Sequence, residues 1–165
     1  MEAERLRKEA ENRLRTLVEH VPAITYTREI GGDHALTYVS PQIRRVLGYS
    51  PAEVVADPDL WRNTLHPHDR RWALAEDRRT GETGDQFALE YRIFAKDGRV
   101  VWLRNEATLV RDEEGNPLHW QGFILDITER KKAEESLRES EELYRNVVEQ
   151  AAENIFLLDP YTGQM

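Results

Sequence analysis

The sequence predicts an α+β domain that lies between two charged helices. Three observations predict it: apolar residues recur every three or four positions at both ends, short segments with helix-start signals fill the middle, and two-residue alternation begins after Gly84. Runs of strands and helices that do not alternate regularly are typical of α+β folds. Hydrophobic residues make up 39% of the chain and charged residues 33%, which suffices for one core and leaves solvated helices.

The first segment, residues 1–21, is predicted to be a linker helix, since it contains no Gly or Pro. Its apolar residues have helical spacing: Leu6, Ala10, Leu14, Leu17 and Val21. Pro22 ends the pattern. The helix therefore leads into the domain, which we expect to span residues 22–128.

The domain begins with two predicted strands, Ile24–Arg28 and Ala35–Val39, separated by the turn signal Gly31-Gly32-Asp33. Short helices follow. Ser50-Pro51-Ala52-Glu53 has the residues of a capping box with Pro at the first helical position. Asp57-Pro58 and His66-Pro67 repeat the arrangement of a cap residue before Pro, and the second predicts a longer helix to about Gly81.

Three strands are predicted after the helices. The first has apolar residues at every second position: Phe87, Leu89, Tyr91 and Ile93. Asp97-Gly98 is a strong hairpin signal. Strands at Val100–Arg111 and Leu118–Asp126 follow, separated by a turn at Glu114-Gly115-Asn116-Pro117.

The segment 129–150 is predicted to be a second helix with a heptad-like seam. The seam is formed by Ala133, Leu137, Ser140, Tyr144, Val147 and Ala151. It favours pairing of two helices, although a helix that stays single is the alternative. Val147–Ala151 followed by Ile155-Phe156 resembles Leu17–Val21 followed by Ile24-Thr25-Tyr26. Residues 151–165 are therefore expected to start a second, truncated copy of the domain, with a strand at Ile155.

Composition excludes several functional classes. The net charge of −8 offers no basic footprint for nucleic acid. The chain has no Cys, which excludes disulfides, thiolate metal sites, cysteine nucleophiles and cysteinyl-flavin photochemistry. No apolar run approaches the roughly 20 residues that cross a bilayer, and no signal-peptide core is present. The segment is expected to be cytoplasmic, without membrane contact of its own.

Several motifs, in order, resemble the PAS sensory family with its C-terminal PAC motif. They are Tyr38-Val39-Ser40-Pro41, Leu47-Gly48-Tyr49-Ser50, Trp61 with Leu65-His66-Pro67-His68-Asp69-Arg70, Glu90-Tyr91-Arg92, Asp97-Gly98 with Val101-Trp102-Leu103, and Gly122 with Asp126-Ile127-Thr128-Glu129-Arg130-Lys131. Their order and spacing carry the resemblance over residues 17–131. A second copy of the family pattern is suspected from about Leu143.

The resemblance implies a five-stranded antiparallel sheet whose inner face and short helices enclose a pocket, flanked by N- and C-terminal signalling helices. It also implies homodimers that form through the helices or the sheet face. Candidate pocket-lining residues are Tyr26, Tyr38, Trp61, Leu65, His66, Leu89, Tyr91 and Trp102. A small-molecule ligand and a core without a ligand are both compatible with this set.

The junction Asp126-Ile127-Thr128 is the candidate signal-coupling element. Asp126 and Thr128 are good cap residues, so this segment can end a strand and start a helix in one step. The resemblance implies an ion pair from Asp126 to the hairpin strands, with Arg92 and Arg104 as candidates. The alternative is a plain structural cap.

No motif identifies a cofactor. Haem, with His66 as candidate axial ligand, and noncovalently bound flavin stay open as alternatives. His66, His68 and Asp69 are better explained by a helix start than by a metal site. No phosphate-binding loop, placed nucleophile or paired metal carboxylates indicates an enzyme in these residues.

The expected function is that of a dimeric sensory input module in a bacterial signalling protein. The resemblance implies neighbouring PAS domains and an output domain in the same chain, and a histidine kinase is the preferred output. A diguanylate cyclase is the alternative output. The alternative from another class is a ligand-free dimerisation and interaction spacer.

Overall fold

A computed structural model describes residues 1–20, 23–31 and 35–157 of the chain. The chain divides into two compact units, Met1–Ile127 and Thr128–Met165. The strands are β1 (Ala23–Arg28), β2 (Leu36–Val39), β3 (Phe87–Phe94), β4 (Val100–Arg111) and β5 (Pro117–Asp126). The helices are α1 (Glu2–His20), α2 (Gln42–Leu47), α3 (Pro51–Ala56), α4 (Leu60–Thr64), α5 (Pro67–Thr83) and α6 (Thr128–Leu157).

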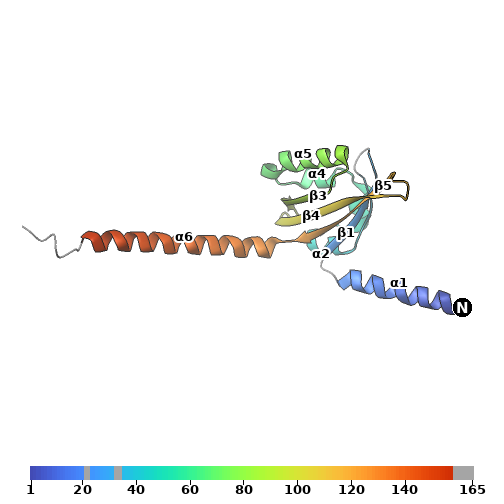
Figure 1. Cartoon of the computed structure of the whole chain (residues 1–165), viewed down its shortest axis with the longest axis horizontal. Helices are drawn as coiled ribbons and strands as arrows, with labels where there is room; N and C mark the ends of the chain where they lie inside the picture. Colours follow the sequence, from blue (N-terminus) through green and yellow to red (C-terminus); the bar gives the residue numbers. More distant parts are fainter. Residues whose placement is uncertain (21–22, 32–34, 158–165) are drawn as a thin grey trace, which may run out of the picture. The chain divides into compact units, whose positions relative to one another are not determined.

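The five strands form one antiparallel sheet in the order β2-β1-β5-β4-β3. The last strand, β5, therefore lies in the centre, between β1 and β4. The helices α4 and α5 lie beside β3 in Figure 1. This arrangement confirms the predicted α+β fold with its five-stranded sheet.

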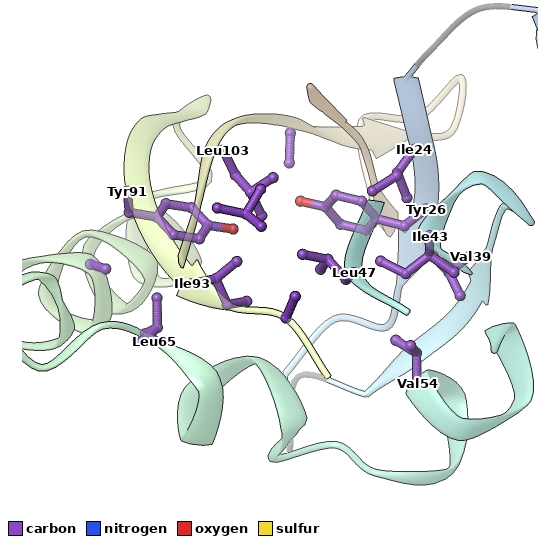
Figure 2. Packing of buried hydrophobic residues seen from close by; sticks show 14 of the residues in the cluster. Ile24, Tyr26, Val39, Ile43, Leu47, Val54, Leu65, Tyr91, Ile93 and Leu103 are labelled. Atoms are coloured by element: carbon purple, nitrogen blue, oxygen red, sulfur yellow. The ribbon is translucent and has the colours of Figure 1, made fainter. Parts of the chain in front are cut away.

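The core lies between one face of the sheet and the short helices. Along β4, buried Val101, Leu103 and Ala107 alternate with residues that are exposed or half-buried. Ile43 and Leu47 of α2 belong to the same apolar cluster as these strand residues. Figure 2 shows these two helix residues within the group of labelled core side chains. The two-residue period of the strands thus separates an inner, covered face from an outer face.

Local sequence signals explain several element boundaries. The Ser50 side chain accepts a hydrogen bond from the Glu53 backbone N–H, and Glu53 accepts one from the Ser50 N–H, as the predicted capping box requires. Gly98 has a φ of 86° in the hairpin between β3 and β4, a conformation that favours glycine. The His66 ring accepts a hydrogen bond from the His68 N–H at the start of α5. These three predictions are confirmed.

Two predicted boundaries are wrong. Helix α4 begins at Leu60, beyond Pro58, because the Asp57 carboxylate accepts a hydrogen bond from the Asp59 N–H in a turn and does not cap a helix at Pro58. Helix α6 continues to Leu157, so residues 155 and 156 are helical and do not form the expected strand. The predicted stop at Pro22, most of the turn at residues 31–33 and residues 158–165 lie outside the described residues.

Helix α6 carries large apolar side chains that are exposed among the described residues. In the predicted seam, Leu137 is 61% exposed, Tyr144 73% and Val147 55%. Exposed pairs such as Arg138 with Glu135 and Glu142 lie along the same helix. Helical stability in proteins comes mostly from packing of an apolar face, so this exposed seam favours a partner helix.

Candidate functional site

A cavity of about 90 Å³ lies between the inner face of the sheet and helices α3, α4 and α5. All five strands contribute to its wall. Its apolar lining residues are Leu36, Val54, Leu60, Phe87, Ala107 and Ile124. Its polar or charged lining residues are Tyr26, Arg28, Asp57, Trp61, Asp77 and Asn105, and Pro58 completes the wall. A mostly apolar cavity with a few converging polar groups is typical of a small-molecule site.

A chain of hydrogen bonds crosses the core next to the cavity. The Tyr26 hydroxyl donates to Oδ1 of Asn105 (2.9 Å), and Nδ2 of Asn105 donates to the Tyr91 hydroxyl (3.1 Å). The indole Nε1 of Trp61 donates to the same Tyr91 oxygen (2.9 Å). Figure 2 shows the rings of Tyr26 and Tyr91 pointing toward one another. The chain links α4 to strands β1, β3 and β4.

Tyr26 and Tyr91, the two tyrosines of this hydrogen-bond network, are neutral at physiological pH. Burial is the largest cause that raises the pKa of Tyr26, to about 12, and burial likewise raises the pKa of Tyr91. Trp61 and Tyr91 also contact edge to face, with ring centroids 5.8 Å apart. The network therefore brings directional hydrogen bonds to the cavity without adding charge.

Gly122 gives Tyr26 the space for this position. The two residues lie opposite each other on β5 and β1. A Cβ atom at position 122 would lie 2.5 Å from the Tyr26 ring. Every other residue type would therefore displace the ring whose hydroxyl donates to Asn105.

An ion pair lies in the wall of the cavity. Nη1 of Arg28, on β1, lies 2.7 Å from Oδ1 of Asp77, on α5, and only 12% and 8% of the two side chains are exposed. The Arg28 guanidinium also lies over the Trp120 ring, 5.5 Å from its centroid. Among the residues that the structure describes, Nε of Arg28 is buried without a hydrogen-bond partner. The pair attaches α5 to the sheet and leaves one strong donor unused.

The predicted pocket-lining residues are only partly placed at the cavity. Tyr26 and Trp61 line it. Leu65 and Tyr91 are fully buried in the core beside it, and Leu89 packs against that core. Tyr38 and Trp102 do not line it, because their strand positions face outward: half of Tyr38 is exposed, and the Arg92 guanidinium covers the Trp102 ring.

His66, the candidate haem ligand, also lies away from the cavity lining. Its ring stacks on Phe94, with centroids 5.5 Å apart, and it caps α5. Burial is the first cause that lowers the pKa of His66. A cavity of about 90 Å³ lies well below the roughly 300–1,000 Å³ of pockets for drug-sized ligands. Among the described residues, no group of three or more His, Cys, Asp or Glu is placed to hold a metal ion.

The two candidate coupling arginines have carboxylate partners other than the expected Asp126. Arg92 binds the buried Asp69 carboxylate through Nη2 (2.6 Å), Nε (3.0 Å) and its backbone N–H (2.8 Å). Arg104 donates to Glu106 (2.7 Å) and to Glu90 (3.4 Å). The expected ion pair from these arginines to Asp126 stays a prediction. The sheet register puts Arg104 directly opposite Glu90, whereas Asp126 lies opposite Leu103.

The junction after β5 is nevertheless anchored to the sheet. The backbone N–H of Ile127 donates to the Trp102 carbonyl (2.9 Å), and the Ile127 side chain is buried. Asp126 contributes to the raised pKa of Arg99, although the hydrogen bond from Arg99 to Asp97 is the larger cause. Helix α6 begins at the next residue, Thr128. Only Ile127 separates the last strand from the first helical residue.

Sequence reasoning missed Arg28, Asp77 and Asn105. Two-residue alternation could have found two of them, because Arg28 follows Ile24 and Tyr26 on the inner face, and Asn105 lies between the buried residues Leu103 and Ala107. Asp77 lies four residues after buried Ala73 on α5. A charged or amide residue at a core position was the signal.

Comparison with known proteins identifies the fold family of the sheet and its covering helices. The PAS fold family matches residues 36–124, more than half of the chain. The two-component sensor PprA of Pseudomonas aeruginosa is 31% identical over 144 residues, which are 85% of this chain and 15% of that protein. The chain spans about one sixth of the length of the curated relatives that it matches.

Two solved structures agree with this assignment. A sensory box histidine kinase/response regulator from Burkholderia thailandensis is 27% identical, with a TM-score of 0.62 over 81% of this chain and 98% of that one. The N-terminal domain of a diguanylate cyclase with a PAS/PAC sensor from Marinobacter aquaeolei is 29% identical, with a TM-score of 0.57 over 66% of this chain and 98% of that one.

None of the helices in the described residues combines the length and apolar character needed to cross a membrane.

Proposed function

Because the chain belongs to the PAS fold family, we propose that it is the sensory input module of a larger signalling protein. In this proposal a small molecule occupies the cavity and changes the sheet, and the change passes through the junction at residues 126–128 to helix α6. Two α6 helices pair in a homodimer and carry the change to an output domain. The module itself carries no catalytic residues and acts in the cytoplasm.

The observation that carries the proposal is the path of strand β5. Ile124 lines the cavity, and the same strand ends at Asp126, directly before Ile127 and helix α6. The neighbouring strand β4 contributes Asn105 and Ala107 to the cavity and accepts the hydrogen bond from Ile127 through Trp102. Strands β4 and β5 therefore both line the cavity and hold the junction from which helix α6 begins.

A histidine kinase is the output that the relatives favour, since both the Pseudomonas two-component sensor and the Burkholderia histidine kinase are similar to this chain. A diguanylate cyclase is the second candidate, supported by the Marinobacter structure. A second PAS domain after α6 also belongs to the proposal. Residues 147–151 of α6 resemble residues 17–21, which precede the first domain.

The test uses a chimaera in which residues 1–151 are joined in heptad register to the dimerisation and catalytic region of a histidine kinase. Ala107→Leu fills the cavity from β4 and stands in for a ligand. We expect it to change autophosphorylation by about 5-fold or more, a typical coupling between sites. Thr108→Leu is the matched control, because Thr108 is exposed and points to the other face of the same strand.

Two outcomes separate the sensory module from the ligand-free spacer. A change in autophosphorylation with Ala107→Leu alone supports transmission from the cavity. If both variants fold, as circular dichroism reports, and both retain the parent activity, the cavity does not communicate with α6. The spacer is then the better description.

A further inference from the structure

Helix α5 is held on the sheet mainly by charged side chains. Of its 17 residues, four are buried: Asp69, Ala73, Asp77 and Thr80. Ala73 is the one apolar side chain among them, and Leu74 adds a half-buried contact to the core. The six-residue helix α2, by contrast, buries Ile43 and Leu47. Since apolar burial supplies most of the stability of a docked helix, the contact of α5 with the sheet is weak for its length.

Both ends of α5 are attached to the edge strand β3. At the start of the helix, the backbone N–H of His66 donates to the Arg92 carbonyl (3.0 Å). The Asp69 carboxylate then accepts three hydrogen bonds from Arg92. At the other end, two residues connect Gly84, the C-cap of α5, to the first residue of β3. The helix lies along β3 (Figure 1), so this strand can serve as its hinge.

An ion pair reaches from the middle of α5 to another part of the sheet. Nη1 of Arg28, on β1, donates to Oδ1 of Asp77 at 2.7 Å. Strands β5 and β4 lie between β1 and β3, so the pair connects α5 to the far half of the sheet. Both residues are in the cavity wall, and Asp77 is the one residue of α5, a helix described throughout, that is in it. Separation of this pair therefore opens the wall on the α5 side.

The energetics of a buried ion pair suit a contact that opens. Only 12% of the Arg28 side chain and 8% of the Asp77 side chain are exposed, so both charges have lost most of their hydration. This desolvation offsets much of their attraction. When the pair separates and water enters, both charges regain hydration, whereas an apolar contact of the same area would gain nothing from water. The helix can therefore leave the sheet at a low cost in free energy.

We infer that α5 is a lid on the cavity, with its attachments to β3 as the hinge and the Arg28–Asp77 pair as the latch. The lid opens when Asp77 leaves Arg28, and a ligand then passes between α5 and the inner face of the sheet. Closure restores the pair and completes the wall. The lid controls access to the cavity of the proposed sensory module, so its use rests on that proposed function.

Cysteine labelling of the whole chain tests the lid, because the chain has no Cys of its own. Ala107→Cys places a thiol in the cavity wall, whereas Val101→Cys places one in the core on the same strand, outside that wall. The probe is methyl methanethiosulfonate, a small neutral reagent whose reaction with a buried thiol follows the opening that exposes it. We expect position 107 to react at least about 100-fold faster than position 101, which only unfolding exposes. Below the unfolding transition, the rate at 107 should depend little on urea, because a lid exposes little surface.

Three substitutions then identify what opens. Asp77→Asn removes the charge of the latch and should raise the rate at position 107 at least about 10-fold, as expected for a lost hydrogen bond between charged groups. Glu82→Gln, which removes an exposed charge of α5, should leave this rate unchanged. Ile43→Val weakens the core from α2. It should raise the rate at position 101 about 3-fold or more and leave the rate at 107 unchanged, because α2 stays in place when the lid opens.

Two results overturn the inference. One is a rate at position 107 that rises with urea as steeply as the rate at 101, since that thiol is then exposed only by unfolding. The other is a rate at 107 that Asp77→Asn leaves unchanged, since the opening then does not separate the latch.

A second variant of the latch keeps the test decisive if Asp77→Asn, which leaves Arg28 without its counter-charge, does not fold. Arg28→Met combined with Asp77→Leu exchanges the ion pair for an apolar contact, a change that is often neutral or stabilising for buried pairs. It should lower the rate at position 107 by about 3-fold or more, because opening then exposes apolar surface to water. An equal or higher rate overturns the lid.

The outcomes also separate the lid from the proposed function. Labelling that is independent of urea and follows the latch, together with a kinase chimaera that does not respond to Ala107→Leu, keeps the lid and removes the sensory function. A chimaera that responds to Ala107→Leu, together with labelling only through unfolding, keeps the sensory function and removes the lid.

Discussion

Leucine side chains have opposite surroundings in two parts of the molecule: the PAS body, formed by the sheet and helices α2 to α5, and helix α6. Leu103 on β4 is fully buried in the core, whereas 61% of Leu137 on α6 is exposed. Ion pairs follow the same division. Asp69 and Asp77 are buried where they pair with arginines, whereas the carboxylates that pair with Arg138 are more than half exposed. The body is therefore stabilised from within, whereas α6 leaves the apolar side chains of its seam exposed.

The largest effect that this comparison predicts is in the core. Leu103→Ala should lower the free energy of unfolding of the body by about 2–5 kcal/mol, because it removes buried methyl groups and leaves a cavity. Urea denaturation followed by tryptophan fluorescence measures this change. Leu118→Ala, at an exposed position of β5, is the matched control and should stay within about 0.5 kcal/mol of wild type. A loss below about 1 kcal/mol for Leu103→Ala would show that the core adapts easily.

The next effect concerns the buried ion pair of the body. The Asp69 carboxylate accepts three hydrogen bonds from Arg92. Asp69→Asn should therefore cost about 1.5–3 kcal/mol at neutral pH, the contribution of hydrogen bonds to a charged group. Glu135→Gln, which removes an exposed carboxylate partner of Arg138 on α6, is the control. Exposed pairs contribute little, so it should be indistinguishable from wild type in the same urea titration.

The pH dependence of the same variant gives a second check. Burial alone would raise the pKa of Asp69, but hydrogen bonds from the Arg92 side chain and backbone outweigh it and lower the pKa below its ordinary value of 3.8. The folded state therefore binds the proton more weakly than the unfolded state. The stabilisation is complete above pH 3.8 and is lost as the pH falls through the lowered pKa. The difference between wild type and Asp69→Asn should narrow in that window, and a constant difference would contradict it.

The sequence was informative wherever a local pattern decides the structure. The alternation of Phe87, Leu89, Tyr91 and Ile93 predicts β3, and Ser50 with Glu53 predicts the start of α3, because both depend only on neighbours in the chain. The whole fold followed from the resemblance of ordered motifs. The cavity followed less completely: of the eight candidate residues, Tyr26 and Trp61 lie in its wall.

The remaining features depend on register and on stop signals that a pattern does not supply. Alternation does not state which residues of two strands lie opposite each other, so the position of Arg104 opposite Glu90 was not predicted. The expected strand at Ile155 relied on similarity to residues 17–26. That first copy has Pro22 before its strand, whereas no Pro separates Ala151 from Ile155. Nothing local therefore stops α6, and it continues to Leu157.

Leu137→Ala tests the other half of the comparison, the exposed seam of α6. Of the substitutions that test the comparison, it should have the smallest effect on the stability of the body. Leu137 is exposed and Ala is an equally good helix former, so the free energy of unfolding of the body should change by less than about 0.5 kcal/mol. Sedimentation equilibrium should instead show weaker dimerisation, since Leu137 occupies a seam position where paired helices interlock.

Leu143→Ala is the matched control for this prediction. Leu143 is on the same helix and 66% exposed, but it flanks the seam. If the two substitutions weaken dimerisation equally, or neither does, the seam is not the contact between helices, and α6 stays single or pairs through another face. If only Leu137→Ala weakens it, the exposed apolar side chains of α6 are the part of the core that a second chain completes.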